Sequence, residues 1–194
     1  MKFYLEITLL PNPEVGRNFL WSKVFQQIHL GLVEMQDDQG RVPIGLSFPE
    51  YVIGEKYSLL GGKLRLLAKD EATLSQFNAS QWLSRLRDYV HCTSIRPVPE
   101  KLTGYAIYRR EQPKTNKERL ARRYAKRHNV DYGNALRCYS SMAHQTITVP
   151  FIRLNSLSSD KAFCLWIKKT VVSEPAGSTF SSYGLSAVSS VPEF

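Results

Sequence analysis

The order of hydrophobic patterns in the first half of the sequence is the feature that most constrains how this chain folds. In residues 2–10 apolar and polar side chains alternate, which predicts a strand with one buried face. Over residues 14–33 apolar residues recur at helical spacing, which predicts a helix. By the same criteria we predict strands at 44–49 and 63–68, a second helix at 71–90 and a fourth strand at 94–98.

The resulting order, β-α-β-β-α-β, is the ferredoxin-like arrangement, an antiparallel sheet with both helices on one face. Pro97 and Pro99 follow it and mark a boundary. We therefore predict an α+β fold, with a ferredoxin-like domain over 1–97 and a second α+β domain over 98–194. In the second domain the patterns predict strands at 103–110, 147–154 and 163–168, a basic helix at 116–128, a short helix or loop at 131–144 and a loop at 173–182.

The charge of the chain points to a polyanionic partner. The formal net charge is +9 and the pI about 9.5, which folding does not require. Apolar runs stay too short for a membrane span, and the N-terminal stretch lacks the features of a secretory signal. Cys92, Cys138 and Cys164 are far apart and form neither a disulfide framework nor a zinc motif. We expect a cytoplasmic protein that does not bind a membrane.

Most of the positive charge lies in one segment. Between residues 106 and 128 there are nine Lys or Arg residues, opposed only by Glu111 and Glu118. At about 100° per residue, five of these cations share a wedge of roughly 140° on the predicted helix, so they form one basic face. These five are Arg119, Arg122, Arg123, Lys126 and Arg127.

This basic face has three possible interpretations: a solvated surface, a surface that binds an anionic membrane, or one that binds a nucleic acid. Like charges four residues apart repel each other, and a ladder of phosphates would relieve that repulsion. Arginine is suited to bidentate contacts with phosphate and guanine. A membrane helix would need large apolar residues opposite the charges, and this one offers mainly Leu120 and Tyr124. We therefore predict a nucleic-acid-binding helix.

His29 is the candidate for chemistry. It lies in an apolar helical stripe with Trp21, Phe25 and Leu32. From spacing alone, a core or edge histidine with a satisfied hydrogen bond is the more frequent explanation. The sequence has no acidic cluster for two-metal phosphoryl transfer and no phosphate-binding glycine-rich loop, so no metal or other cofactor is predicted. If the protein cuts nucleic acid, a metal-free route with a histidine base fits RNA, whose 2′-hydroxyl can attack the adjacent phosphate.

Several short motifs, taken in order, resemble the CRISPR repeat-processing endoribonucleases of type I-F systems. The resemblance covers nearly the whole chain. The motifs are FYLEI at 3–7, VFQQIH at 24–29, IGLSFP at 44–49, YRREQ at 108–112, NKERLARR at 116–123, KRH at 126–128, PFIRLNS at 150–156 and YGLS at 183–186.

The resemblance implies a function and partners. Members of this family bind the stem-loop of a CRISPR repeat in precursor RNA and cut at the 3′ base of the stem by 2′-hydroxyl attack, without a metal. They stay on the hairpin as a subunit of the type I-F crRNA-guided complex, so its other subunits are further expected partners in the bacterial cytoplasm. Two alternatives are a non-catalytic and a transposon-associated subunit that binds the same kind of hairpin, and a third is a DNA-binding relative.

The resemblance also implies residue roles by matched position. His29 is the expected general base, Ser156 holds the ribose of the cleaved nucleotide, and Tyr183 positions His29. Among the residues expected to bind RNA, Arg110 and Gln112 read base edges and Phe163 stacks on the terminal base pair. Arg123 and Arg127 enter the RNA groove, and the residues on phosphates are Arg119, Arg122 and Lys126. Lys114 and Ser158 are also expected to bind RNA.

Overall fold

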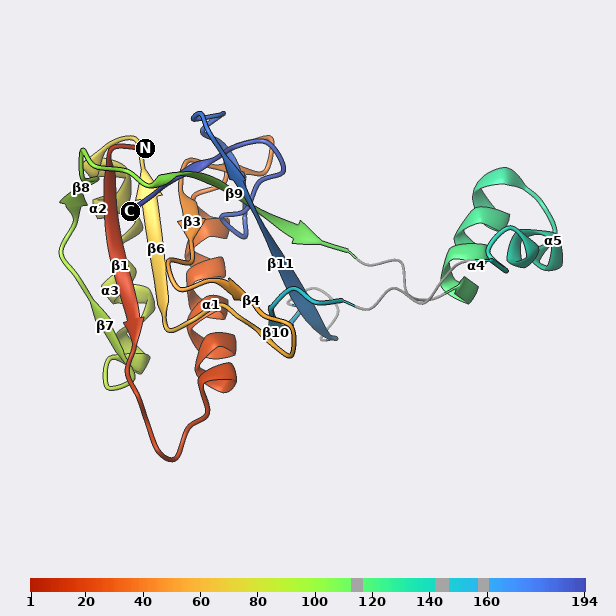
Figure 1. Cartoon of the computed structure of the whole chain (residues 1–194), viewed down its shortest axis with the longest axis horizontal. Coiled ribbons are helices and arrows are strands. Elements are labelled where there is room, and N and C mark those ends of the chain that lie inside the picture. Colours follow the sequence, from red (N-terminus) through yellow and green to blue (C-terminus); the bar gives the residue numbers. More distant parts are fainter. Residues whose placement is uncertain (113–116, 142–146, 157–160) are drawn as a thin grey trace. The chain divides into compact units, whose positions relative to one another are not determined.

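The computed structural model describes residues 1–112, 117–141, 147–156 and 161–194. Contacts between residues divide the chain into two compact units. The larger unit comprises Met1–Glu111 and Val149–Phe194, and the helical unit comprises Gln112–Thr148. The helices and strands of both units are labelled in Figure 1. The domain boundary expected after residue 97 stays a prediction.

The first half of the larger unit has the predicted ferredoxin-like topology. Its sheet has the strand order β3-β6-β1-β7, and every pairing is antiparallel. Figure 1 shows the long helix α1 behind this sheet, and α1 contacts both β1 and the short helix α3. The predicted α+β class is thereby confirmed. The elements are β1 (Phe3–Leu9), α1 (Arg17–Glu34), β3 (Gly45–Ser47), β6 (Lys63–Ala68), α3 (Ala79–Trp82) and β7 (Val90–Cys92).

The periodic apolar residues of α1 place it firmly in the core. Val24, Phe25, Ile28 and Leu32 are completely buried, and each such side chain contributes roughly 1.5–3 kcal/mol relative to exposure. His29 follows Ile28 and is half-buried at the edge of this apolar face. The helix therefore carries His29 on a rigid support.

The prediction of one helix over 71–90 was wrong. The segment forms α2 (Glu71–Phe77), the short α3 and a 3₁₀ turn at Ser84–Leu86 before β7 begins. The break occurs at Asn78, whose left-handed backbone (φ 47°) ends α2, with its N–H donating to the carbonyl of Leu74. Asparagine tolerates this conformation better than most residues do. The fourth strand is consequently β7, and the predicted strand 94–98 is reduced to β8 (Arg96–Pro97), which pairs with β1.

A second antiparallel sheet, of order β10-β11-β9-β13, completes the larger unit. Its alternating residues Ile152, Leu154, Leu165 and Ile167 are buried in the same core as α1. The three strands predicted in this half are present, whereas the expected loop 173–182 contains a short strand. The elements are β9 (Gly104–Glu111), β10 (Phe151–Asn155), β11 (Ala162–Val172), β12 (Phe180–Ser181) and β13 (Val191–Glu193).

Two small sheets were not predicted. β12 pairs with β2 (Arg41–Val42), and β4 (Val52–Ile53) pairs with β5 (Ser58–Leu59). Their strands are two residues long, too short for a pattern to stand out. The pairing of β12 with β2 matters most, because it holds the loop that follows β12.

The helical unit contains α4 (Lys117–His128) and α5 (Tyr132–Arg137), which confirms the predicted basic helix over its described residues. The end of α4 is capped by Asn129 in the left-handed region (φ 50°), with the N–H of Val130 donating to the carbonyl of Ala125. Asp131 caps α5. The N-cap expected at Thr115 or Asn116 lies outside the described residues. Within the described part of the chain, no helix is long and apolar enough to cross a membrane.

Candidate active site and nucleic-acid interface

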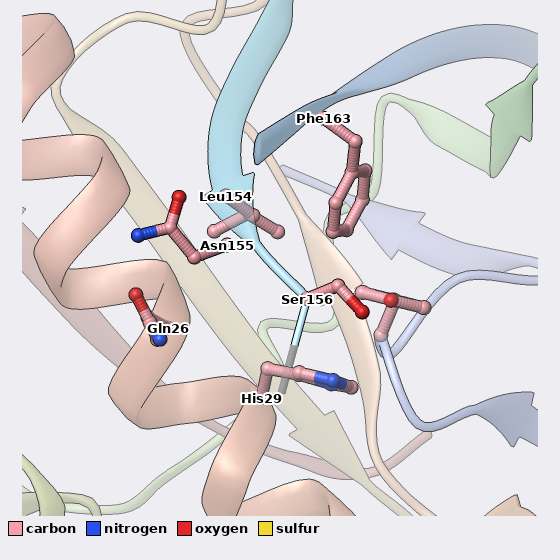
Figure 2. Close-up of a pocket in the computed structure, with 7 residues that line it drawn as sticks. Gln26, His29, Leu154, Asn155, Ser156 and Phe163 are labelled. Carbon is pink, nitrogen blue, oxygen red and sulfur yellow. The ribbon is translucent and has the colours of Figure 1, made fainter. Parts of the chain in front are cut away.

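The three predicted catalytic residues meet at one cavity of about 170 Å³ in the larger unit (Figure 2). They come from three separate elements: His29 from α1, Ser156 from the end of β10, and Tyr183 from the loop after β12. Phe163, at the start of β11, also lines the cavity. Three further lining residues were not predicted as site residues, namely Gln26, Leu154 and Asn155.

One of the two ring nitrogens of His29 is held by a hydrogen bond within the protein. The Nδ1 atom lies 2.8 Å from the backbone carbonyl oxygen of Ser182. A carbonyl oxygen only accepts hydrogen bonds, so Nδ1 carries the proton and donates it. In the neutral ring the lone pair is then on Nε2, which is the arrangement that a histidine base needs.

Tyr183 fixes the plane of that imidazole. The two rings are stacked, with centroids 4.2 Å apart and planes within 4° of parallel. Both side chains are half-buried. The stacking limits rotation of the ring of His29 about its side-chain bonds, while the Ser182 carbonyl limits its tautomers.

A tight turn holds both of these contacts in place. Gly184 has φ 66°, and its N–H donates to the carbonyl of Ser181. The Gly184 carbonyl accepts from the N–H of Leu46 on β3, and a Cβ at position 184 would come within 2.3 Å of Cγ of Leu46. Glycine is required here for both reasons, because it alone combines left-handed backbone with so close an approach.

Sequence reasoning missed the Ser182 carbonyl. A backbone oxygen acts whatever side chain the residue carries, so no residue type marks it. The predicted loop and the glycine after Tyr183 signalled a turn, but they did not reveal which carbonyl would face His29.

Ser156 stands at the point where β10 ends. Its N–H donates to the carbonyl of Lys161 at 2.9 Å, next to the paired residues Asn155 and Ala162 of β10 and β11. Ser156 and His29 both line the same cavity. Ser158, predicted to bind RNA, lies outside the described residues.

A cation lies beside two of the aromatic rings that line the cavity. Arg110 follows the buried Ala106 and Tyr108 on the same face of β9, because alternate residues of a strand share a face. Its guanidinium carbon lies 5.3 Å from the ring centroid of Phe163 and 5.7 Å from that of Tyr183. The rings of Phe163 and Tyr183 meet edge to face at 6.5 Å. Arg110 is nonetheless exposed and accessible to a ligand.

The other predicted RNA-binding residues belong to the helical unit. Gln112 is exposed, and Lys114 lies outside the described residues. The five cations of the predicted basic face on α4 are exposed while Ala121 is buried, so this face is present in the structure. Glu118 and Arg122 approach to 4.0 Å in an exposed pair that neutralises little of the charge. The exposed basic residues are Arg119, Arg122, Arg123, Lys126 and Arg127.

No cluster of three or more His, Cys, Asp or Glu side chains suited to a metal ion occurs in the part of the chain that the structure describes. The absence of a metal requirement stays a prediction.

Comparison with known proteins identifies the family. Residues 4–194 match the family described as CRISPR-associated protein (Cas_Csy4). A protein of Escherichia coli (strain UTI89 / UPEC) named CRISPR-associated endonuclease Cas6/Csy4 is 36% identical over 195 residues, covering 100% of both chains. A protein of the same name from Pseudomonas aeruginosa (strain UCBPP-PA14) is 35% identical over 197 residues, also covering 100% of both. The chain therefore belongs to the Csy4 family of CRISPR-associated proteins, and the resemblance found in its motifs is confirmed.

A solved structure titled "CRISPR associated protein Cas6" superposes with a TM-score of 0.33 at 14% identity, covering 100% of this chain and 99% of that chain. That likeness is too weak to add to the assignment, which rests on the sequence relatives.

Proposed function

We propose that this chain is a metal-independent endoribonuclease that binds the stem-loop of a CRISPR repeat in precursor RNA and cuts at the 3′ base of the stem. The observation that carries the proposal is the pair of contacts on His29. The Ser182 carbonyl at Nδ1 and the stacked ring of Tyr183 leave Nε2 as a base in a cavity shared with Ser156. The names of the relatives, which are endonucleases, support the same activity.

In the proposed reaction the RNA supplies its own nucleophile. Nε2 of His29 takes the proton of the 2′-hydroxyl, and the 2′-oxygen bonds to the adjacent phosphorus. The bond from phosphorus to the 5′-oxygen of the next nucleotide breaks, and that oxygen takes up one proton. The products are a 2′,3′-cyclic phosphate and a 5′-hydroxyl, and His29 returns its proton to solvent. Ser156 holds the ribose so that its 2′-oxygen is in line with the bond that breaks.

The RNA contacts are proposed to come from both units. In the larger unit, Phe163 stacks on the last base pair of the stem and Arg110 reads a base edge beside it, which the closeness of their side chains supports. In the helical unit, Gln112 reads a second base edge. The arginines of α4 bind the groove and the phosphates, and this contact relieves their mutual repulsion. Lys114 and Ser158 are proposed to add contacts to the RNA.

After the cut, the protein is proposed to stay on the hairpin as a subunit of the type I-F crRNA-guided complex in the bacterial cytoplasm. The stem-loop lies on the 5′ side of the cut, so the contacts that select the substrate also hold the product. Tight product retention would appear as a single turnover per protein molecule, with the labelled hairpin product co-eluting with the protein.

The test uses the repeat hairpin of the neighbouring CRISPR array, labelled at its 5′ end and incubated with the protein in EDTA. We expect cleavage at the 3′ base of the stem, with a cyclic phosphate on the labelled fragment. A hairpin with a 2′-deoxynucleotide at the cut should bind equally well and remain whole. A requirement for Mg²⁺, or cleavage of the 2′-deoxy hairpin, would overturn the mechanism.

A further inference from the structure

The helical unit contains a hollow that the catalytic proposal does not use. It has a volume of about 130 Å³ and lies between α4 and the turn that follows α5. We call it the aromatic hollow. It is lined by Leu120, Arg123, Tyr124, Arg127, His128 and Tyr139.

Three rings form its aromatic surface. Tyr124 and His128 are four residues apart on α4, and their rings lie 4.3 Å apart at 32°. The ring of Tyr139, from the turn after α5, meets Tyr124 edge to face at 6.1 Å. Tyr124 and Tyr139 are only half-buried and His128 is exposed. These rings therefore keep accessible surface, unlike aromatic residues that only fill a core.

Two arginines border the rings. Arg123 and Arg127 are also four residues apart on α4 and belong to the basic face of the helix. Each is adjacent in the sequence to a ring of the hollow, Arg123 to Tyr124 and Arg127 to His128. A ligand that fits here has a flat ring and a negative charge on the same small group, which is the chemistry of a nucleotide.

We propose that the aromatic hollow binds the base of one unpaired nucleotide in the loop of the RNA hairpin, while Arg123 and Arg127 bind the flanking phosphates. This inference rests on the proposed function, since it assumes that the hairpin lies on α4. A base within the stem is paired and stacked on both faces, so it cannot enter. A loop base is free to turn outward and stack on aromatic side chains, as is common in the recognition of single-stranded RNA.

The experiment is an abasic scan of the hairpin loop, read by binding affinity in the full-length protein. With the wild type, an abasic site at one loop position should weaken binding roughly tenfold, within the range of base–aromatic stacking. Tyr139→Leu should lose a similar amount on the intact hairpin and should lose nothing more at that abasic position. Tyr139→Phe, which keeps the ring, should bind like the wild type.

Tyr132→Leu is the matched control, because Tyr132 is an exposed tyrosine of the same unit outside the hollow. It should leave the affinity and the scan unchanged. A flat scan with the wild type, additive losses for Tyr139→Leu and the abasic site, or an equal loss for Tyr139→Phe would each overturn the inference. Failure of the proposed function would look different, because the wild type would then not bind or cut the intact hairpin.

Discussion

The two units differ in the size of the buried core that supports their candidate functional residues. In the larger unit the candidate general base belongs to a helix that packs into a large apolar core. In the helical unit the basic residues belong to a helix with almost no buried core behind it. His29 follows Ile28, which is completely buried on α1. By contrast, the buried residues among those described in the helical unit are Ala121 and Ala135.

The difference follows from what each task demands. A base must be held within a fraction of an ångström of its productive position, so its support has to be rigid before the substrate arrives. A ladder of phosphate contacts tolerates adjustment, and its charges repel until the RNA neutralises them. The comparison predicts that variants of His29 and of the turn that contacts it change the cutting rate, while variants of the basic face of α4 change affinity and its salt dependence.

The largest expected effect is that of His29→Ala. Removing the base should lower the single-turnover cutting rate by roughly 10²–10⁴-fold while leaving hairpin affinity nearly unchanged, because the base acts in the transition state. The matched control is His91→Ala, since His91 is an exposed histidine on β7. Normal cutting by His29→Ala would remove the proposed base.

Gly184→Ala should come next. The added methyl group meets Leu46 and strains a backbone with φ 66°, so the turn carrying the Ser182 carbonyl and Tyr183 must shift away from His29. We expect the cutting rate to fall by on the order of tenfold and its pH profile to move, with hairpin affinity retained. Gly16→Ala is the control, because a Cβ at Gly16 meets nothing within 4 Å. An unchanged rate and pH profile would show that the turn does not position His29.

Arg123→Ala tests the other side of the comparison. It should weaken hairpin binding roughly tenfold and flatten the dependence of affinity on salt by about one phosphate contact. The cutting rate of the saturated complex should stay the same. Arg87→Ala, a change of an exposed arginine in the larger unit, should leave the affinity and its salt dependence unchanged. A slower saturated rate for Arg123→Ala would mean that the two tasks are not separated.

The smallest effect concerns stability and pH. Burial of Glu6 raises the pKa of its carboxyl, but hydrogen bonds and charge from Arg65 and Lys63 outweigh burial and lower the pKa below its ordinary value. A carboxyl with a lowered pKa in the folded state contributes stability above its unfolded pKa, and this is lost as the pH falls through the folded pKa. Glu6→Gln should therefore lower Tm by roughly 2–4 °C at neutral pH, and the difference should shrink below about pH 4.

The helical unit offers the control for this measurement. Glu118→Gln breaks an exposed pair with Arg122, which contributes little in solvent, so Tm should not change at either pH. A constant difference between Glu6→Gln and the wild type across the same pH range would show that the ion pairs of Glu6 are not its source.

Regular patterns made the main elements predictable. Each pattern arises because one helix or strand has one face toward the core and the other toward solvent. This explains the alternation of 2–10 and 63–68, the helical spacing of α1 and the one-sided charge of α4. The helix predicted over 71–90 was wrong because its apolar spacing continues across Asn78, whose left-handed backbone turns the chain. The spacing of apolar residues does not reveal a change in backbone direction at a single residue.

The candidate site also has a part that the sequence predicts and a part that it does not. The family resemblance brought out His29, Ser156, Tyr183 and Phe163, and the structure places all four around one cavity. Their roles stay predictions until the variants are measured. The order of strands and helices, the basic face and the residue types available for chemistry were determined by the sequence itself, because periodicity and charge are local properties.

Only the tertiary structure decided which nitrogen of His29 is left to act as the proposed base, since Ser182 is 153 positions away and acts through its backbone. The same holds for the aromatic hollow, where a turn after α5 brings Tyr139 to Tyr124. Contacts between distant segments, and contacts made by backbone atoms, arise when the chain packs, and no spacing within one element encodes them.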